Sequence, residues 1–165
     1  MSVDNEQGIA TGWLDGELSP RGRELAQALG ERRRAETDVV YTSDLGRALE
    51  TAELAFGGSE VPVQVDARLR ECDYGELNGH PVAEIDAERL RRIEEPFPGG
   101  ESYRDVIART RSFLDDVRAR HEGERVLAIA HSANRWALQH LLEGTPLEEL
   151  IVAPFDWQPG WEFRL

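Results

Sequence analysis

The chain has 165 residues, enough for about one domain with a sizeable buried core. Its hydrophobic fraction of 40% and charged fraction of 31% are typical of a globular protein. The net charge of −13 argues against nucleic acid as a partner, because a phosphate backbone requires a basic surface. We also expect no membrane partner, since no apolar run reaches the ~20 residues of a spanning helix. The single cysteine, Cys72, excludes an internal disulfide and agrees with a cytoplasmic localisation.

Helix and strand signals alternate along the first part of the chain. Ser19 and Pro20 supply an N-cap and a first-turn proline, and apolar residues at positions 25, 26 and 29 give the helix that follows a buried stripe. The β-rich run 38–41 predicts a short strand. The polar run 42–44 then predicts the cap of a helix that continues to Ala55.

The same alternation continues to the end of the chain. Residues 61–65 and 161–165 predict short strands, and Ser102–Arg120 has the most regular helical spacing of apolar residues. Residues 126–130 are apolar throughout, which is typical of a strand covered on both faces. Thr145 and Pro146 open a late helix. No repeat or linker divides the chain, so we expect a single α/β domain over residues 1–165.

Two polar side chains follow the two clearest strands. Arg47 lies in the first turn of the helix after strand 38–41, and His131 directly follows strand 126–130. In α/β sheets the functional site lies at the carboxyl ends of the strands. An arginine binds phosphate oxygens with a two-pronged fork, and helix N-termini add backbone N–H groups. The sequence therefore suggests that Arg47 and His131 face one anion.

Five short motifs strengthen this interpretation. They are T-G-W-L-D at 11–15 with L-S-P-R-G at 18–22, Y-T-S-D-L-G-R-A at 41–48, L-R-E-C-D-Y-G-E-L-N-G at 69–79, F-P-G-G-E-S at 97–102, and H-S at 131–132. In this order they resemble the motifs of the histidine phosphatase (phosphoglycerate mutase-like) superfamily. The resemblance runs from Ser2 to the end of the chain. It implies a three-layer α/β/α sandwich with a mostly parallel sheet.

The resemblance also implies roles for individual residues. Arg47 would clamp the transferred phosphoryl group, His131 would hydrogen-bond its oxygens, and Glu71 would protonate the leaving oxygen and then activate water. The substrate and phosphate contacts would come from Asn5, Thr11, Gly12 and Ser132. The implied chemistry is covalent phosphoryl transfer, which divides one difficult step into two easier ones. It requires no metal and no nucleotide, so we expect no cofactor.

One part of the family pattern is absent from the chain. The family's nucleophilic histidine lies in an R-H-G-x-[ST] motif after the first strand, and only the end of that motif matches, at Ser2. None of His80, His121 and His140 stands in such a context. We hypothesise that the natural polypeptide starts about ten residues upstream of Met1. The first strand would then be missing here, and we expect two neighbouring strands to lack ladder partners.

These observations lead to one main hypothesis and three alternatives. The main hypothesis is a phosphomonoester hydrolase that works through a phosphohistidine in its full-length form on a small phosphorylated metabolite, with the present chain inactive. The 27 residues between Glu71 and Gly99 leave little room for the insertion of the mutase branch, although mutase-type phosphoryl transfer stays open. In the two remaining alternatives, the chain is a non-catalytic phosphate-binding protein, or a structural fragment that is stable only in a homo-oligomer. Asn5 and Thr11 would then be ordinary capping and turn residues.

Overall fold

A three-stranded parallel sheet forms the centre of the fold in the computed structural model, which describes residues 1–165. Its strands are β2 (Val39–Thr42), β3 (Val63–Val65) and β5 (Val126–Ile129), in the order β3-β2-β5. Val40 of β2 lies between Val63 and Leu127 in the register. Because the strands are parallel, their carboxyl ends meet at one edge of the sheet.

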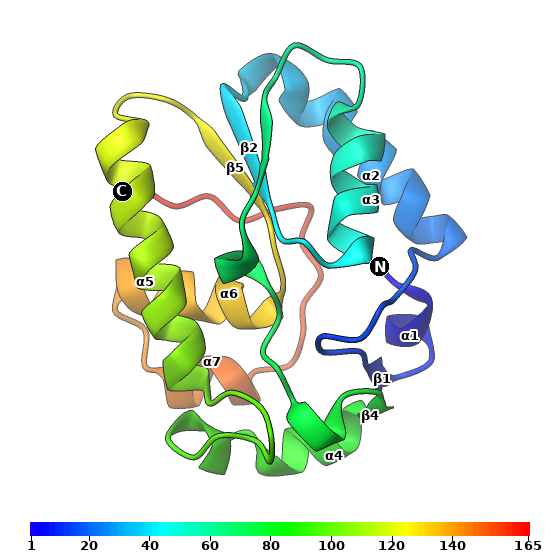
Figure 1. Cartoon of the computed structure of the whole chain (residues 1–165), viewed down its shortest axis with the longest axis vertical. Coiled ribbons are helices and arrows are strands. Elements are labelled where there is room, and N and C mark those ends of the chain that lie inside the picture. The colour runs from blue at the N-terminus through cyan, green and yellow to red at the C-terminus, as the bar shows by residue number, and fades with distance from the viewer.

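Helices cover both faces of this sheet (Figure 1). One face is covered by α2 (Pro20–Arg33) and α3 (Gly46–Phe56), and the other by α5 (Tyr103–Arg120) and α6 (Ser132–Leu138). Side chains alternate between the faces, as a strand requires: Val40 packs with Phe56 of α3, and its neighbour Tyr41 packs with Phe113 of α5. The fold is therefore the predicted three-layer α/β/α arrangement.

Apart from four short 3₁₀ helices, the remaining elements form the end of the molecule below the sheet in Figure 1. They are α1 (Val3–Glu6), β1 (Ile9–Ala10), β4 (His80–Pro81), α4 (Val82–Glu88), a π-helical turn (Gln139–Glu143) and α7 (Leu147–Val152). Strand β1 pairs with β4 in the antiparallel sense. A third core cluster fills this end around Phe97, Tyr103 and Trp136, and it also buries Cys72 completely. None of the helices combines the length and the hydropathy that crossing a membrane requires.

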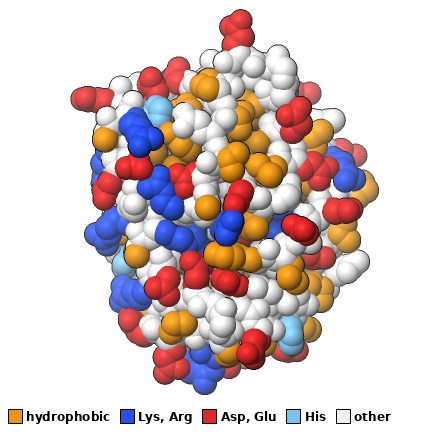
Figure 2. All heavy atoms as spheres, in the orientation of Figure 1, with side chains coloured by type: hydrophobic (Ala, Val, Ile, Leu, Met, Phe, Trp, Pro, Cys, Tyr) orange, Lys and Arg blue, Asp and Glu red, His pale blue; other side chains and the backbone are white.

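Charged side chains are distributed in opposed pairs over the surface. In Figure 2 basic and acidic side chains lie beside one another across the visible face. Arg68 lies 2.7 Å from Asp66 and 2.9 Å from Asp116, and Arg104 lies 2.9 Å from Glu94. Most of the arginines thus have an acidic neighbour. Exposed ion pairs of this kind each contribute little to stability.

The predicted starts of two helices are confirmed. The Ser19 hydroxyl accepts a hydrogen bond from the Gly22 N–H at 3.1 Å, and Pro20 is the first residue of α2. Ser102 begins α5 with a reciprocal capping box, in which the carboxylate of Asp105 accepts from the Ser102 N–H at 2.8 Å. Such caps supply partners for N–H groups that the helix itself leaves open.

Four expectations about the chain were wrong. Helix α3 is capped at Leu45, without a side-chain hydrogen bond, rather than by residues 42–44. Residues 161–165 form no strand. Strand β5 is not fully covered, since Ala128 is exposed although its neighbours pack on both faces of the sheet. The sheet also has no internal gap, because β2 pairs directly with β5, and its two unpaired edges are the outer edges of β3 and β5.

Helices α2 and α3 approach each other closely at Gly30. A Cβ atom at this position would lie 2.2 Å from the carbonyl oxygen of Ala55 in α3. We therefore expect Gly30→Ala to destabilise the protein by about 1–3 kcal/mol in urea denaturation, although alanine favours an isolated helix by about 1 kcal/mol. Gly46→Ala is the matched control, because a Cβ there meets nothing closer than 3.9 Å. Equal effects of the two substitutions would contradict close packing at Gly30.

Candidate functional site

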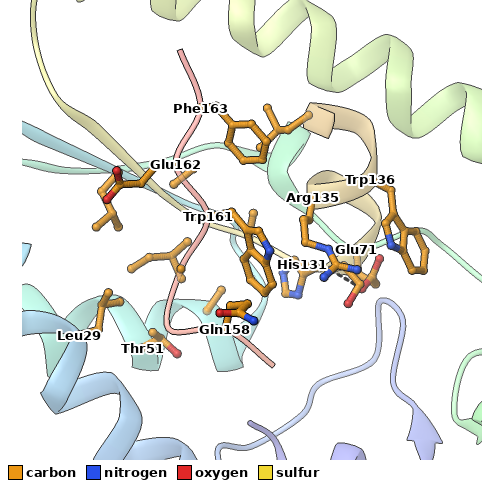
Figure 3. A pocket seen from close by; sticks show the side chains of 18 of the residues that line it. Leu29, Thr51, Glu71, His131, Arg135, Trp136, Gln158, Trp161, Glu162 and Phe163 are labelled. Carbon is orange, nitrogen blue, oxygen red and sulfur yellow. Dashed lines mark hydrogen bonds between the residues drawn. The ribbon is translucent and has the colours of Figure 1, made fainter. Parts of the chain in front are cut away.

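An open cavity of about 1710 Å³ lies along β5, continues past its carboxyl end and is also lined by Arg47 of α3 (Figure 3). Its other wall includes most residues of the C-terminal segment 153–165. The seven residues that the sequence singled out all line it: Asn5, Thr11, Gly12, Arg47, Glu71, His131 and Ser132. The fold therefore brings together side chains from four separate parts of the chain, and their individual roles stay predictions.

His131 lies at the junction of β5 and α6 and is held through both ring nitrogens. Its Nε2 lies 2.8 Å from the hydroxyl of Ser43, which follows β2, and its Nδ1 lies 3.4 Å from Nη2 of Arg47. A guanidinium can only donate, so Nδ1 accepts and the proton resides on Nε2. Burial is the main cause that lowers the pKa of His131 well below 6.5, and the positive charges of Arg47 and Arg109 lower it further. The ring is therefore a neutral imidazole.

This low pKa of His131 makes stability depend on pH. The unfolded chain binds a proton at His131 below about pH 6.5, while the folded chain keeps the ring neutral to lower pH. The unfolded state then carries more protons, so the free energy of unfolding falls as the pH decreases. We expect His131→Asn to lose less stability than the wild type between about pH 7 and pH 5. Parallel urea denaturation curves for both proteins measure this, and identical pH slopes would contradict a neutral His131.

Arg47 connects α3 to the loop that follows β1. Its Nη2 donates to the Gly12 carbonyl at 2.8 Å, and its Nη1 donates to the Leu14 carbonyl at 3.3 Å. Gly12 has a φ of +55°, and a Cβ there would lie 1.8 Å from the side-chain oxygen of Asn78, so the tight turn requires glycine. Of the five N–H groups of Arg47, three have protein partners and two are left for a ligand.

The carboxylate of Glu71 is buried at the start of α6. Its Oε1 accepts from the N–H groups of Cys72 at 2.8 Å and Ala133 at 3.1 Å, and its Oε2 accepts from the N–H of Ser132 at 3.2 Å. Glu71 therefore occupies the first N–H groups of the helix, a favourable place for a negative charge. Ser132, which the sequence assigned to substrate or phosphate binding, thus donates its backbone N–H to this carboxylate.

Two other candidates have local structural partners. The side-chain oxygen of Asn5 accepts from the Ser2 N–H at 3.2 Å, so Asn5 completes the capping box of α1. The Thr11 hydroxyl donates to Asp4 at 2.7 Å. Both residues line the cavity, but their observed contacts are those of capping and turn residues.

Sequence reasoning missed two arginines next to this site. Arg109 of α5 donates to the carbonyls of Arg68, Arg70 and Glu71 at 2.6–2.9 Å, and it pairs with Glu101 at 2.9 Å. It therefore fixes the segment that carries Glu71. Arg135 lies one helical turn after His131 and lines the same cavity. The spacing of four residues would have revealed Arg135, because residues i and i+4 share a helix face.

The residues that converge on the cavity can be compared with those of known proteins. A family model described as the histidine phosphatase superfamily (branch 1) matches residues 1–156. The chain belongs to this superfamily. Phosphoserine phosphatase 1 of Hydrogenobacter thermophilus is 35% identical over 154 residues, covering 88% of this chain and 73% of the relative.

Other relatives in the superfamily include mutases as well as phosphatases. The 2,3-bisphosphoglycerate-dependent phosphoglycerate mutase of a Methylobacterium species is 34% identical over 164 residues, covering 88% of this chain and 78% of the mutase. Among solved structures, Bacillus stearothermophilus YhfR has a TM-score of 0.83 at 33% identity, with 96% of this chain and 83% of YhfR covered. A mycobacterial glucosyl-3-phosphoglycerate phosphatase bound to VO3 has a TM-score of 0.78 at 32% identity, with 93% and 83% covered.

Proposed function

We propose that this histidine phosphatase-fold chain provides the phosphoryl-binding half of a phosphomonoester hydrolase that works through a phosphohistidine. The observation that carries the proposal is the convergence of Arg47, Glu71 and His131 on one cavity at the carboxyl end of β5. The relatives named as phosphatases and mutases support phosphoryl transfer as the chemistry. The short connection between Glu71 and Gly99 favours the hydrolase over the mutase.

The proposed roles follow from the contacts of each side chain. Two open N–H groups of Arg47 bind phosphoryl oxygens and offset the negative charge that develops during transfer. His131 contributes a hydrogen bond to an oxygen after it takes up a proton, because the neutral ring donates only to Ser43. Glu71 in its protonated form passes a proton to the leaving oxygen, and the carboxylate that results, which three backbone donors stabilise, then receives a proton from water.

The nucleophile is not among the histidines of this chain. His121 is held on both ring nitrogens, by Tyr41 at 2.8 Å and Glu124 at 2.6 Å. His80 is exposed beside Glu84, and His140 is bonded to the carbonyl of Thr145. We therefore propose that the 165-residue chain binds phosphate without turnover, and that a histidine in an Arg-His-Gly segment supplies the missing group.

Two polypeptides test this proposal. One is the 165-residue chain, and the other is the same chain extended at its N-terminus by a strand with the Arg-His-Gly motif. We expect phosphomonoester hydrolysis and an acid-labile phosphoenzyme from the extended chain alone. Failure of the extended chain on every phosphomonoester would refute the hydrolase, and isomerisation that requires 2,3-bisphosphoglycerate would favour the mutase. Robust hydrolysis by the unextended chain, lost in His131→Ala, would contradict its proposed inactivity.

A further inference from the structure

The guanidinium of Arg135 is unusual among the arginines of this protein. Its side chain is only partly exposed, has no acidic group within 4.0 Å and donates no hydrogen bond to the protein, and its Nε is buried without a partner. Burial lowers its pKa, as expected for a cation withdrawn from water. A cation in this position costs free energy unless an anion satisfies it.

The aromatic side chains of the C-terminal segment enclose Arg135. Its Cζ lies 4.8 Å from the ring centre of Trp161 and 5.6 Å from that of Phe155. Figure 3 shows the side chain of Arg135 extending from α6 toward His131 and Glu71, with Trp161 next to it. The guanidinium lies over the two rings, and no acceptor in the protein occupies its N–H groups, so a planar ligand with two oxygens matches its unused donors.

Glu71 does not neutralise Arg135. Its charge acts on Arg135 and partly opposes the lowering of the pKa, but the two groups form no ion pair, and both carboxylate oxygens accept backbone hydrogen bonds instead. The phosphoryl group is assigned to Arg47 and His131. Arg135 is therefore a second cationic position in the same cavity.

We propose that Arg135 binds a carboxylate of the substrate, so that the site takes phosphorylated carboxylic acids; this rests on the proposed function. A carboxylate matches the planar fork with two parallel hydrogen bonds. A second phosphate dianion is disfavoured, because Glu71 is the nearby charge and Arg89, the next cation of the wall, is engaged by Asp86 and the carbonyl of Ile151. In the alternative, Arg135 only anchors the C-terminal segment through Phe155 and Trp161.

A matched pair of ligands tests the carboxylate. Phosphoglycolate and ethyl phosphate differ chiefly in that one carries a carboxylate where the other has a methyl group. We expect the 165-residue chain to bind phosphoglycolate about tenfold more tightly in titration calorimetry. In Arg135→Met, which retains an unbranched side chain against Trp161, this ratio is expected to fall to near one. Arg104→Met removes an exposed, distant positive charge and is expected to keep the wild-type ratio.

The outcomes separate the two proposals. A wild-type ratio near one, or a ratio that survives in Arg135→Met, would overturn the carboxylate role while leaving phosphate binding intact. If neither ester nor inorganic phosphate binds, the proposed function fails, and the carboxylate proposal fails with it. Arg135→Lys adds a check on geometry, because lysine keeps the charge but not the fork, and we expect an intermediate ratio.

Discussion

Replacing Arg109 with leucine is expected to lower the free energy of unfolding by about 3 kcal/mol or more. The guanidinium satisfies three backbone carbonyls and both oxygens of Glu101, and the two side chains are only 15% and 19% exposed. Without the Arg109 guanidinium, the carboxylate of Glu101 and the three backbone carbonyls lose their donors. Each buried group that is left without a partner costs about 1–3 kcal/mol. Urea denaturation at neutral pH measures the loss.

The matched control for Arg109 is Arg104, which lies on the same helix. Arg104 pairs with Glu94, but these side chains are 48% and 69% exposed, so Arg104→Leu should cost no more than about 1 kcal/mol. Arg109→Lys should fall between the two leucine variants, because an ammonium keeps the charge but cannot reach all of the carbonyls. Equal effects of Arg109→Leu and Arg104→Leu would show that the network around Glu101 contributes little.

The second large effect is expected at Arg47. We expect Arg47→Met to raise the dissociation constant for inorganic phosphate or vanadate about 10- to 100-fold, the equivalent of losing one charge-assisted contact. Arg47 also holds the carbonyls of Gly12 and Leu14, so limited proteolysis of the loop should accompany the titration. Faster cleavage of that loop in Arg47→Met would show that the substitution has loosened it. We expect less loosening in Arg47→Lys, because lysine keeps a hydrogen-bond donor.

Arg104→Met serves as the control for the change in net charge. Its side chain pairs with Glu94 at 2.9 Å and lines no part of the cavity. We expect it to keep the wild-type affinity for phosphate. An Arg47→Met protein that binds phosphate as tightly as the wild type would remove Arg47 from the phosphoryl site.

Local patterns predicted those parts of the fold that depend on local interactions. Ser19 and Ser102 cap helices through hydrogen bonds to residues three positions away, so the sequence contains the whole signal. The predicted cap at 42–44 was wrong because distant partners take its polar groups. Asp44 forms an ion pair with Arg70, with one contact at 2.6 Å, and the Ser43 hydroxyl bonds to His131.

The candidate site was predictable to the extent that it follows strand ends. Arg47 and His131 end up 3.4 Å apart because β2 and β5 are parallel neighbours. Arg109 carried no comparable signal, since its partners are backbone carbonyls about forty positions away along the chain, and any residue type would provide them. The exposure of Ala128 could not be predicted from the sequence either, because an apolar run has the same pattern in a central strand and in an edge strand.

The unpaired outer edge of β5 also bears on how the molecules behave toward one another in solution. A strand with open N–H and C=O groups is a template for sheet growth between chains, whereas the charge of −13 makes the molecules repel. Dissolved salt alters only the second of these effects, since the screening length shrinks from about 10 Å at 0.1 M to about 3 Å at 1 M. Ionic strength therefore controls the balance, and the colloidal stability of this protein should decline as salt is added.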